Sequence, residues 1–200
     1  MPFGYPVFLE LEGRRAVVIG SLAMREGKAD QLLAAGANVD VFDDGAWRPS
    51  DLEGAFVCVA SSPDPAERDR IAAEARARRV LVNVMDDVPN CDFAAPAVVR
   101  RGDLVLAIST GGRSPALARR LREELERRFG PEWAIVLDAL RDVREETLPE
   151  LPDLPTRSAR WSAALDLDEA EELVRAGRAD ELRRRLLRRL RAPVHEETRA

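Results

Sequence analysis

The chain has few of the residues that build disulfides and metal sites. Its 200 residues include two cysteines, Cys58 and Cys91, and a single histidine, His195. Two cysteines do not make a disulfide framework, and together with one histidine they cannot supply the four ligands of a structural zinc site. Because His195 lies in the expected C-terminal tail, catalysis by a core histidine is not expected. The sequence predicts no resident metal.

Long apolar runs and an excess of positive charge are also missing. No apolar stretch could span a bilayer and the N-terminus does not resemble a signal peptide, so we expect a cytoplasmic protein without membrane contact. The net charge is -5, from 31 basic and 36 acidic residues, which argues against nucleic acid as a partner. The arginines of 183–189 alternate with leucines at helical spacing. We interpret them as the solvated face of a packed helix, and a basic groove for an acidic substrate stays open.

Short apolar runs alternate with helical patterns through the first half of the chain. The runs cover 16–19, 39–42, 55–60, 80–85 and 104–108, and a clear helical pattern covers 65–79. Continuous apolar strands of this kind are typical of a parallel sheet that is covered on both faces. We therefore predict an α/β fold with a Rossmann-like, doubly wound parallel sheet.

The second half is helical in pattern. Ser114 and Pro115 are typical of a helix start, and apolar residues then recur at helical spacing on one face. Further helices are expected over 132–146, 168–176 and 179–191, and prolines over 148–157 indicate a linker. The apolar helix faces suggest a homodimer. We expect a Rossmann-like NAD-binding domain over 1–111, a dimerisation region over 112–147, and a linker with a C-terminal helical region over 148–200.

The first apolar run ends at a glycine, where dinucleotide-binding folds hold pyrophosphate at a helix N-terminus. The residues there are Gly20, Ser21, Leu22, Ala23 and Met24, so only the first glycine of the G-x-G-x-x-G pattern is present. Leu22 stands where the backbone should approach the pyrophosphate. The loop fits either a nucleotide site with a degenerate glycine motif or an ordinary strand–turn–helix connection.

Acidic residues gather at the end of the second apolar run. Asp40, Asp43 and Asp44 are followed by Gly45. A carboxylate there can accept a hydrogen bond from a ribose 2′-OH and disfavours a 2′-phosphate. The alternative is a solvated turn, for which Asp-Asp-Gly is a common composition. If a nucleotide binds, we expect NAD rather than NADP, with Asp43, Asp44 and Gly45 among its contacts.

The most specific stretch runs from Val82 to Arg119. It reads VNVMDDVPNCDF over 82–93 and STGGRSPALAR over 109–119. This stretch resembles the N-terminal half of siroheme synthases and their stand-alone relatives, the precorrin-2 dehydrogenase / sirohydrochlorin ferrochelatase family. The resemblance covers about residues 5–145, and the lack of a methyltransferase segment is similar to the stand-alone form.

The resemblance implies an enzyme that oxidises the tetrapyrrole precorrin-2 to sirohydrochlorin with NAD⁺ and, in many members, then takes Fe²⁺ as a substrate for insertion. It also implies a homodimer. Asp86 stands where the family has its essential carboxylate, which could take a proton as hydride leaves, or steer Fe²⁺. The alternative for Asp86 is a plain loop residue.

The same resemblance marks a substrate-binding loop of Thr110, Gly111, Gly112, Arg113 and Ser114. Glycines before a helix N-terminus expose N–H groups to an anion, and arginine suits the carboxylates of a tetrapyrrole. The alternative is simple helix capping by Ser114, which could hold alongside binding. Ser114 also matches a position that is phosphorylated in some family members.

The departures from the family pattern all fall in the part of the predicted fold that would bind the nucleotide. They are the glycine loop, the residues 60–65 after the third apolar run, and the short segment 45–54. Three interpretations stay open. The first is an NAD-dependent dehydrogenase, with or without ferrochelatase activity. The others are a chelatase that no longer uses NAD and a non-catalytic tetrapyrrole-binding dimer. Asp86 and the loop over 110–114 favour an enzyme.

Overall fold

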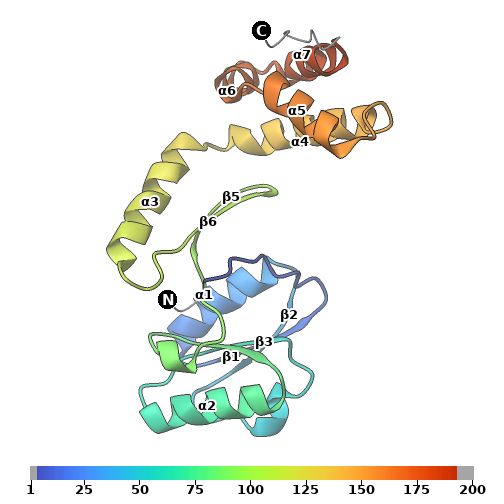
Figure 1. Ribbon diagram of the computed structural model, residues 1–200. Helices are drawn as coiled ribbons and strands as arrows, with labels where there is room; N and C mark the ends of the chain where they lie inside the picture. The colour runs from blue at the N-terminus through green and yellow to red at the C-terminus, as the bar shows by residue number, and fades with distance from the viewer. Residues whose placement is uncertain (1–3, 193–200) are drawn as a thin grey trace, which may run out of the picture. The chain divides into compact units, whose positions relative to one another are not determined.

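The computed structural model describes residues 4–192, without the side chains of 22–26, and its chain divides into two compact units, Met1–Pro96 and Ala97–Ala200 (Figure 1). The residue at which we expected the first domain to end, 111, lies inside the second unit. The first unit contains β1 (Arg15–Ile19), α1 (Leu22–Leu33), β2 (Asn38–Phe42), β3 (Val57–Ala60), α2 (Pro65–Ala77) and β4 (Leu81–Val84). The second contains β5 (Ala97–Arg101), β6 (Leu104–Ile108), α3 (Pro115–Arg128), α4 (Glu132–Thr147), α5 (Leu154–Ala164), α6 (Leu167–Arg175) and α7 (Ala179–Arg191).

The sheet of the first unit has four parallel strands in the order β2-β1-β3-β4. Ile19 of β1 lies opposite Phe42 of β2 on one side and Ala60 of β3 on the other. The chain leaves β1 toward β2 and then crosses back to β3, so the strand order reverses beside β1. The topological switch point therefore lies between β1 and β3, and the predicted doubly wound sheet is confirmed.

Side chains alternate between the two faces of this sheet, and each face has its own apolar cluster. On one face Ile19 and Cys58 pack with Ile71 of α2, and on the other Ala16 packs with Leu32 of α1. Figure 1 shows α1 and α2 on opposite sides of the strands. Burial raises the pKa of the Cys58 thiol to about 12, which confirms Cys58 as a small core residue.

The short connection between β2 and β3 contains no α-helix among the described residues, only a 3-10 turn at Pro49–Leu52. Trp47 is 3% exposed, and its indole Nε1 donates to Glu67 Oε1 at 2.6 Å. The Arg70 guanidinium lies 4.0 Å from the centroid of its ring. Leu52 is fully buried in the same cluster as Trp47. These two large side chains cover the part of the sheet that a crossover helix would otherwise cover.

The fifth predicted strand is wrong as a member of the parallel sheet. It forms β6, which pairs antiparallel with β5 in a separate two-stranded sheet of the second unit. Arg101 lies opposite Leu104, so the turn contains only Gly102 and Asp103, and Gly102 has φ of 58°. A two-residue turn of this kind joins neighbouring segments into a hairpin, whereas a parallel register would need a long crossover.

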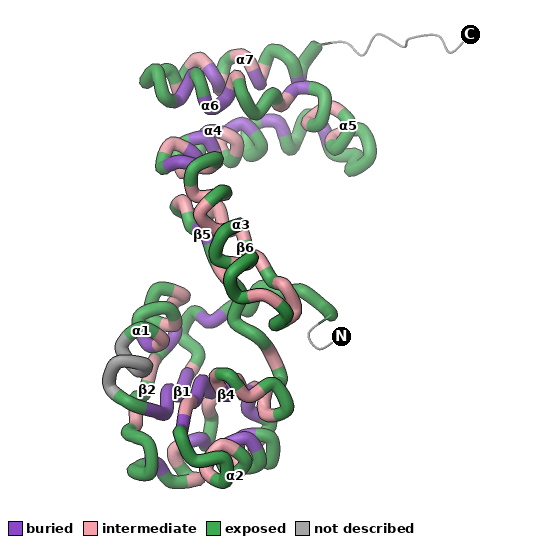
Figure 2. The backbone as a smooth tube through the Cα atoms, turned by 90° about the vertical axis from the view of Figure 1, so that its left-hand side faces the viewer, coloured by how far each residue is buried: buried purple, intermediate pink, exposed green. Residues whose placement is uncertain are grey.

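Helices α4, α5, α6 and α7 enclose the core of the second unit. Their buried side chains include Val136, Val143, Leu173 and Leu186. Helix α3, by contrast, has no buried residue, and Figure 2 shows it in the colours of intermediate and exposed positions. Leu117 and Leu121 on α3 are 50% and 40% exposed. Leu117 and Leu121 are thus open to solvent, although α3 also contacts β5 and β6.

Helix α5 is not predicted by the sequence, in which the prolines over 148–157 indicate a linker. The Asp153 side chain accepts a hydrogen bond from Thr156 N at 2.8 Å and caps the helix. Pro155 follows in the first turn, where the missing N–H costs no helical hydrogen bond. The prolines therefore start a helix at Leu154 instead of only separating two helices.

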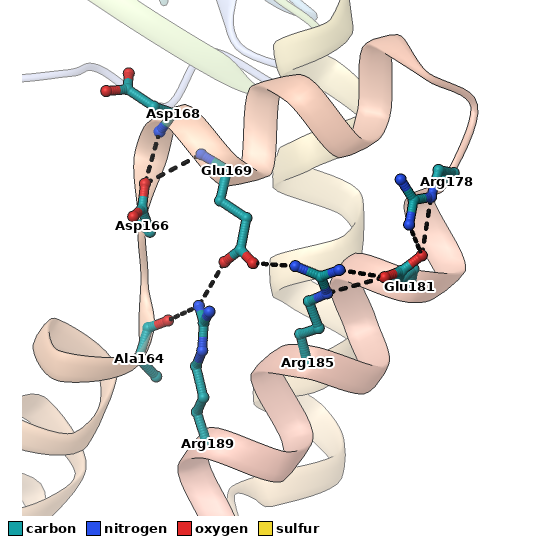
Figure 3. A network of polar contacts seen from close by, with 8 residues as sticks. All are labelled: Ala164, Asp166, Asp168, Glu169, Arg178, Glu181, Arg185 and Arg189. Atoms are coloured by element: carbon teal, nitrogen blue, oxygen red, sulfur yellow. Dashed lines mark hydrogen bonds and ion pairs between the residues drawn. The ribbon is translucent and has the colours of Figure 1, made fainter.

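Arginines and glutamates connect α5, α6 and α7 in the second unit (Figure 3). Glu169 accepts from Arg185 Nη1 at 2.5 Å and from Arg189 Nη1 at 2.6 Å, and Arg189 Nη1 also donates to Ala164 O at 3.0 Å. Leu186 and Leu190 are buried on the neighbouring face of α7. The predicted packed helix is confirmed, although Arg185 and Arg189 are ion-paired rather than simply solvated.

None of the helices in the described part of the chain has the length and apolar character that crossing a bilayer requires.

Candidate functional site

The carboxyl ends of the four parallel strands meet at one edge of the first unit. Backbone hydrogen bonds continue the ladder past the strands there, from Gly20 N to Phe42 O (3.1 Å), Ser61 N to Ile19 O (2.9 Å) and Met85 N to Ala60 O (2.8 Å). They bring 20–21, 43–45, 61–62 and 85–86 to the same edge. Open α/β sheets bind ligands in the crevice outside this edge, at the switch point, which here lies between β1 and β3.

The glycine loop connects β1 to α1 at the switch point. Gly20 is buried, and Ser21 is the N-cap of α1, with an extended backbone and no hydrogen bond from its side chain to the helix. The backbone of Leu22, Ala23 and Met24 forms the first turn of α1, and their side chains lie outside the described residues. A helix start without a side-chain cap leaves its first N–H groups for water or a ligand, and the helix dipole favours an anion there.

The acidic residues after β2 are divided by the fold. Asp40 accepts from Arg15 Nε at 2.7 Å, and Arg15 is the first residue of β1, so Asp40 is engaged away from the ligand edge. Asp43, Asp44 and Gly45 lie at that edge, in a turn where Ala46 N donates to Asp43 O at 3.1 Å. Of the three acidic residues, Asp40 is thus held away from the ligand edge by a long-range ion pair.

Asp44 makes a contact that the solvated-turn interpretation does not include. Its Oδ2 accepts a hydrogen bond from Ser62 Oγ at 3.0 Å, across from the loop after β3. Asp43 and Asp44 are both exposed. Sequence reasoning missed Ser62, since the distance along the chain gives no sign that the two loops meet.

Asp86 lies directly after β4 at the same edge. It is exposed and has φ of 60°, a left-handed conformation that costs energy for any residue except glycine and is tolerated best by Asp and Asn. Within the described residues, its side chain forms no hydrogen bond or ion pair. The Asp86 carboxylate is therefore free to meet a ligand, in a backbone conformation of the kind that clusters at functional sites.

The residues that follow Asp86 are held firmly. Asp87 Oδ2 accepts from Arg68 Nε at 2.8 Å and from Asn90 Nδ2 at 3.2 Å, and the Arg68 hydrogen bond lowers the pKa of Asp87. Cys91 Sγ donates to Val84 O at 3.0 Å. Asp87 is thus an anchor for the loop, and Arg68 is a second residue at this edge that the sequence analysis missed.

The predicted substrate loop lies in the second unit, between β6 and α3. Ser114 Oγ accepts from Leu117 N at 3.2 Å, so Ser114 caps α3, as the alternative interpretation predicts. Thr110 Oγ1 accepts from Ser114 N at 3.3 Å and donates to Ser114 O at 3.1 Å, which closes the loop. Gly111 and Gly112 have φ of 61° and 76°, so the turn depends on them.

These internal hydrogen bonds change how the loop could bind an anion. The N–H groups of Gly111, Arg113 and Ser114 are all used within the loop, by Ser109 Oγ, Thr110 O and Thr110 Oγ1. The guanidinium of Arg113 is exposed and forms no ion pair with any part of the chain that the structure describes. An anion would therefore meet the Arg113 side chain rather than a cradle of glycine N–H groups.

A separate cavity of about 510 Å³ lies in the second unit, between α4 and α5. Its lining residues are Leu137, Leu140, Arg141, Arg144, Leu154, Arg157, Ser158 and Trp161, and none of them was predicted as a site residue. Among residues 4–192, no group of three or more His, Cys, Asp and Glu side chains is arranged to hold a metal ion.

Two family models match the chain. The model described as "Putative NAD(P)-binding" covers residues 7–97, and the model described as "Sirohaem biosynthesis protein central" covers residues 101–128. The first match corresponds to the unit with the parallel sheet. The second begins in the β5–β6 hairpin and ends with α3, so it includes the loop over 110–114.

Curated relatives carry the name siroheme synthase. The siroheme synthase of Methylococcus capsulatus is 30% identical over 211 residues, which cover 96% of this chain and 44% of that protein. Siroheme synthase 1 of Cronobacter sakazakii is 37% identical over 140 residues, which cover 60% of this chain and 30% of that protein. The chain spans less than half the length of these relatives.

The fold itself has a solved counterpart. The structure of SirC, a precorrin-2 dehydrogenase, matches with a TM-score of 0.61 and 21% identity, over 93% of this chain and 98% of that chain. Similarity at this level of identity describes the fold, while the family models and the relatives describe the sequence. Together they show that the chain belongs to the siroheme synthase N-terminal family.

Proposed function

We propose that this protein is an NAD-dependent dehydrogenase of siroheme synthesis, which oxidises precorrin-2 to sirohydrochlorin. The observation that carries the proposal is the position of Asp86: an exposed carboxylate without a partner in the described chain, at the same sheet edge as the Gly20 loop. The names of the relatives and the NAD(P)-binding family model support the choice of reaction.

The first unit offers the groups that an NAD molecule needs. Gly20 and the uncapped start of α1 would face the pyrophosphate, with contacts from Ser21 and from the backbone of 22–24. Asp43, Asp44 and Gly45 would border the ribose of the adenosine half. Bound NAD⁺ would supply the hydride acceptor. The side chain of Leu22 is the departure that this arrangement must tolerate.

Asp86 would handle the proton that the oxidation releases. Removing two hydrogens from precorrin-2 means that a hydride leaves to the nicotinamide and a proton leaves to a base. The Asp86 carboxylate can be that base, since no other side chain of the described chain occupies it. In the second unit, Arg113 is proposed to contact substrate carboxylates, from a loop shaped by Thr110, Gly111, Gly112 and Ser114.

The chelatase alternative is favoured by the glycine loop, because Leu22 replaces a glycine on the nucleotide side while Asp86 is retained. In that case Asp86 would accept pyrrole protons as Fe²⁺, a substrate here, enters the macrocycle. A homodimer is part of either proposal, with 112–147 as the dimerisation region, since Leu117 and Leu121 of α3 are exposed.

The experiment is an anaerobic absorbance assay of the purified protein with fresh precorrin-2, with and without NAD⁺, in parallel with the Asp86→Asn variant. Sirohydrochlorin that forms only with NAD⁺ and the native protein supports the dehydrogenase. No oxidation, but metal insertion when sirohydrochlorin and Fe²⁺ are supplied, supports the chelatase that has lost NAD chemistry. Inactivity in both assays, with retained tetrapyrrole binding, supports a non-catalytic binding dimer.

A further inference from the structure

Ser62, in the loop after β3, is a nearly buried hydroxyl at the ligand edge. It is 7% exposed, and its Oγ takes part in two hydrogen bonds. It accepts from Asp64 N at 3.1 Å and donates to Asp44 Oδ2 at 3.0 Å. A hydroxyl has a single proton, and a backbone N–H can only donate, so the Ser62 proton is directed at the Asp44 carboxylate.

The position of Ser62 is itself fixed by Arg68 of α2. Arg68 Nη1 donates to Ser62 O at 2.9 Å, while Arg68 Nε donates to Asp87 Oδ2 at 2.8 Å. The two ends of one guanidinium thus hold the loop after β3 and the loop after β4. Because a guanidinium is planar and rigid, Ser62 cannot shift along the edge without breaking one of these bonds.

The Ser62 hydrogen bond gives Asp44 a defined orientation. Asp44 is exposed, and Oδ2 is the oxygen that Ser62 contacts, so Oδ1 remains for a group from outside the protein. The end of the second strand is where this fold meets ribose hydroxyls, and a carboxylate there repels a 2′-phosphate. Asp40 cannot take this part, because Arg15 holds it.

We infer that Ser62 is a positioning residue that orients Asp44 toward the ribose hydroxyls of NAD and thereby sets the preference for NAD over NADP. The inference rests on the proposed function, in that it requires the first unit to bind the cofactor. It adds a residue in the segment 60–65, where the chain departs from the family pattern.

The test measures dissociation constants of NAD⁺ and NADP⁺ by titration calorimetry on the full chain, so it needs no tetrapyrrole turnover. The variants are Ser62→Ala, Asp44→Asn, the double variant, and Ser62→Thr, which keeps a hydroxyl. Ser50→Ala is the matched control, since Ser50 is exposed in the β2–β3 connection and its side chain forms no hydrogen bond within the described residues. Melting temperatures of all variants report on folding.

Ser62→Ala is expected to weaken NAD⁺ binding roughly two- to tenfold, less than a charge-assisted hydrogen bond is worth, because Ser62 acts only through Asp44, with a smaller change for NADP⁺. The double variant should match Asp44→Asn alone, because Ser62 acts through Asp44. Ser62→Thr and Ser50→Ala should keep the native preference. If Ser62→Ala does not fold, the test uses the ratio of the NAD⁺ and NADP⁺ dissociation constants in Asp44→Asn and Ser62→Thr.

Equal weakening of both nucleotides by Ser62→Ala, or additive losses in the double variant, would overturn the inference, since either outcome indicates a purely structural role. A native protein that binds NAD⁺ but whose preference does not respond to Ser62→Ala would defeat the inference and leave the proposed dehydrogenase intact. A native protein that binds neither nucleotide would defeat both.

Discussion

Arg68 Nε lies 2.8 Å from Oδ2 of Asp87, and this contact joins helix α2 to the loop that carries Asp86. Both side chains are less than one quarter exposed, at 24% and 17%. The hydrogen bond from Arg68 is the largest cause of the lowered pKa of Asp87, followed by the bond from Asn90. The residue beside the proposed catalytic carboxylate is therefore a fixed anion, and it holds the loop in place.

Replacing Arg68 with Lys should separate positioning from charge. A lysine keeps the positive charge but cannot hold Asp87 and the Ser62 carbonyl at once, so we expect a loss of about 0.5–1 kcal/mol in unfolding free energy and a larger proportional loss of kcat than of substrate binding. Denaturant unfolding and steady-state kinetics measure the two effects. Arg78→Lys at the C-cap of α2 is the control, because Arg78 pairs within the described residues only with Glu74, one turn away. Equal behaviour of the two variants would contradict this role for Arg68.

Asp86→Asn should abolish turnover while the fold is retained. Asparagine also adopts positive φ readily, so the backbone can keep its φ of 60° without added strain and only the charge is lost. Asp86→Ala should be less stable than Asp86→Asn, since alanine is strained at that φ. The measurements are precorrin-2 oxidation rates and thermal melts. Near-native rates in Asp86→Asn would remove Asp86 from the mechanism.

The second unit should lose stability in acid through Glu169. Hydrogen bonds from Arg189 and then Arg185 lower the pKa of Glu169, so its folded-state pKa lies below the unfolded one. A depressed carboxyl pKa stabilises the fold above the unfolded value of about 4.3, and the contribution disappears as the pH falls through the folded pKa. We expect Glu169→Gln to cost about 1 kcal/mol at pH 7 and less at pH 3, because protonation of the native carboxylate removes the same ion pairs.

Urea unfolding followed by the fluorescence of Trp133 and Trp161, both in the second unit, measures this difference. Glu172→Gln is the control, because Glu172 is exposed on α6 and its carboxylate has no partner in the described chain. A loss for Glu169→Gln that is equal at both pH values would mean that packing, and not the ion pairs with Arg185 and Arg189, accounts for it.

Trp47→Phe should destabilise the first unit by about 1–2 kcal/mol. Phenylalanine cannot donate to Glu67 and fills less of the buried site beneath Arg70, so a hydrogen bond and part of the packing are lost. Trp161→Phe is a matched control, because the buried indole Nε1 of Trp161 has no hydrogen-bond partner and its removal should cost less. Thermal melts of the two variants give the comparison, and the reverse order would contradict the assignment of Trp47 as the cover of the β2–β3 connection.

Most elements of the first unit, and two of the last helices, follow from local sequence. The apolar runs at 16–19 and 55–60 are continuous because both faces of β1 and β3 are buried, and a pattern of that kind is visible without knowing the neighbours. Ser114 could be named as a cap for the same reason, since its partner Leu117 N is three residues away. Asp86 was identified through the family resemblance, and its role remains a prediction.

The pairing of strands and the meeting of charged groups depend on the three-dimensional fold. The run at 104–108 has the composition of a parallel strand, yet it forms a hairpin with 97–101, because pairing depends on the nearest partner and not on composition. The contacts of Asp40 with Arg15, Asp44 with Ser62, and Asp87 with Arg68 join residues 18–25 positions apart. Most helices and strands could be predicted from residue patterns alone, since those patterns depend on near neighbours. The fold decided the partners at the ligand edge, since those depend on which strand ends the sheet brings together.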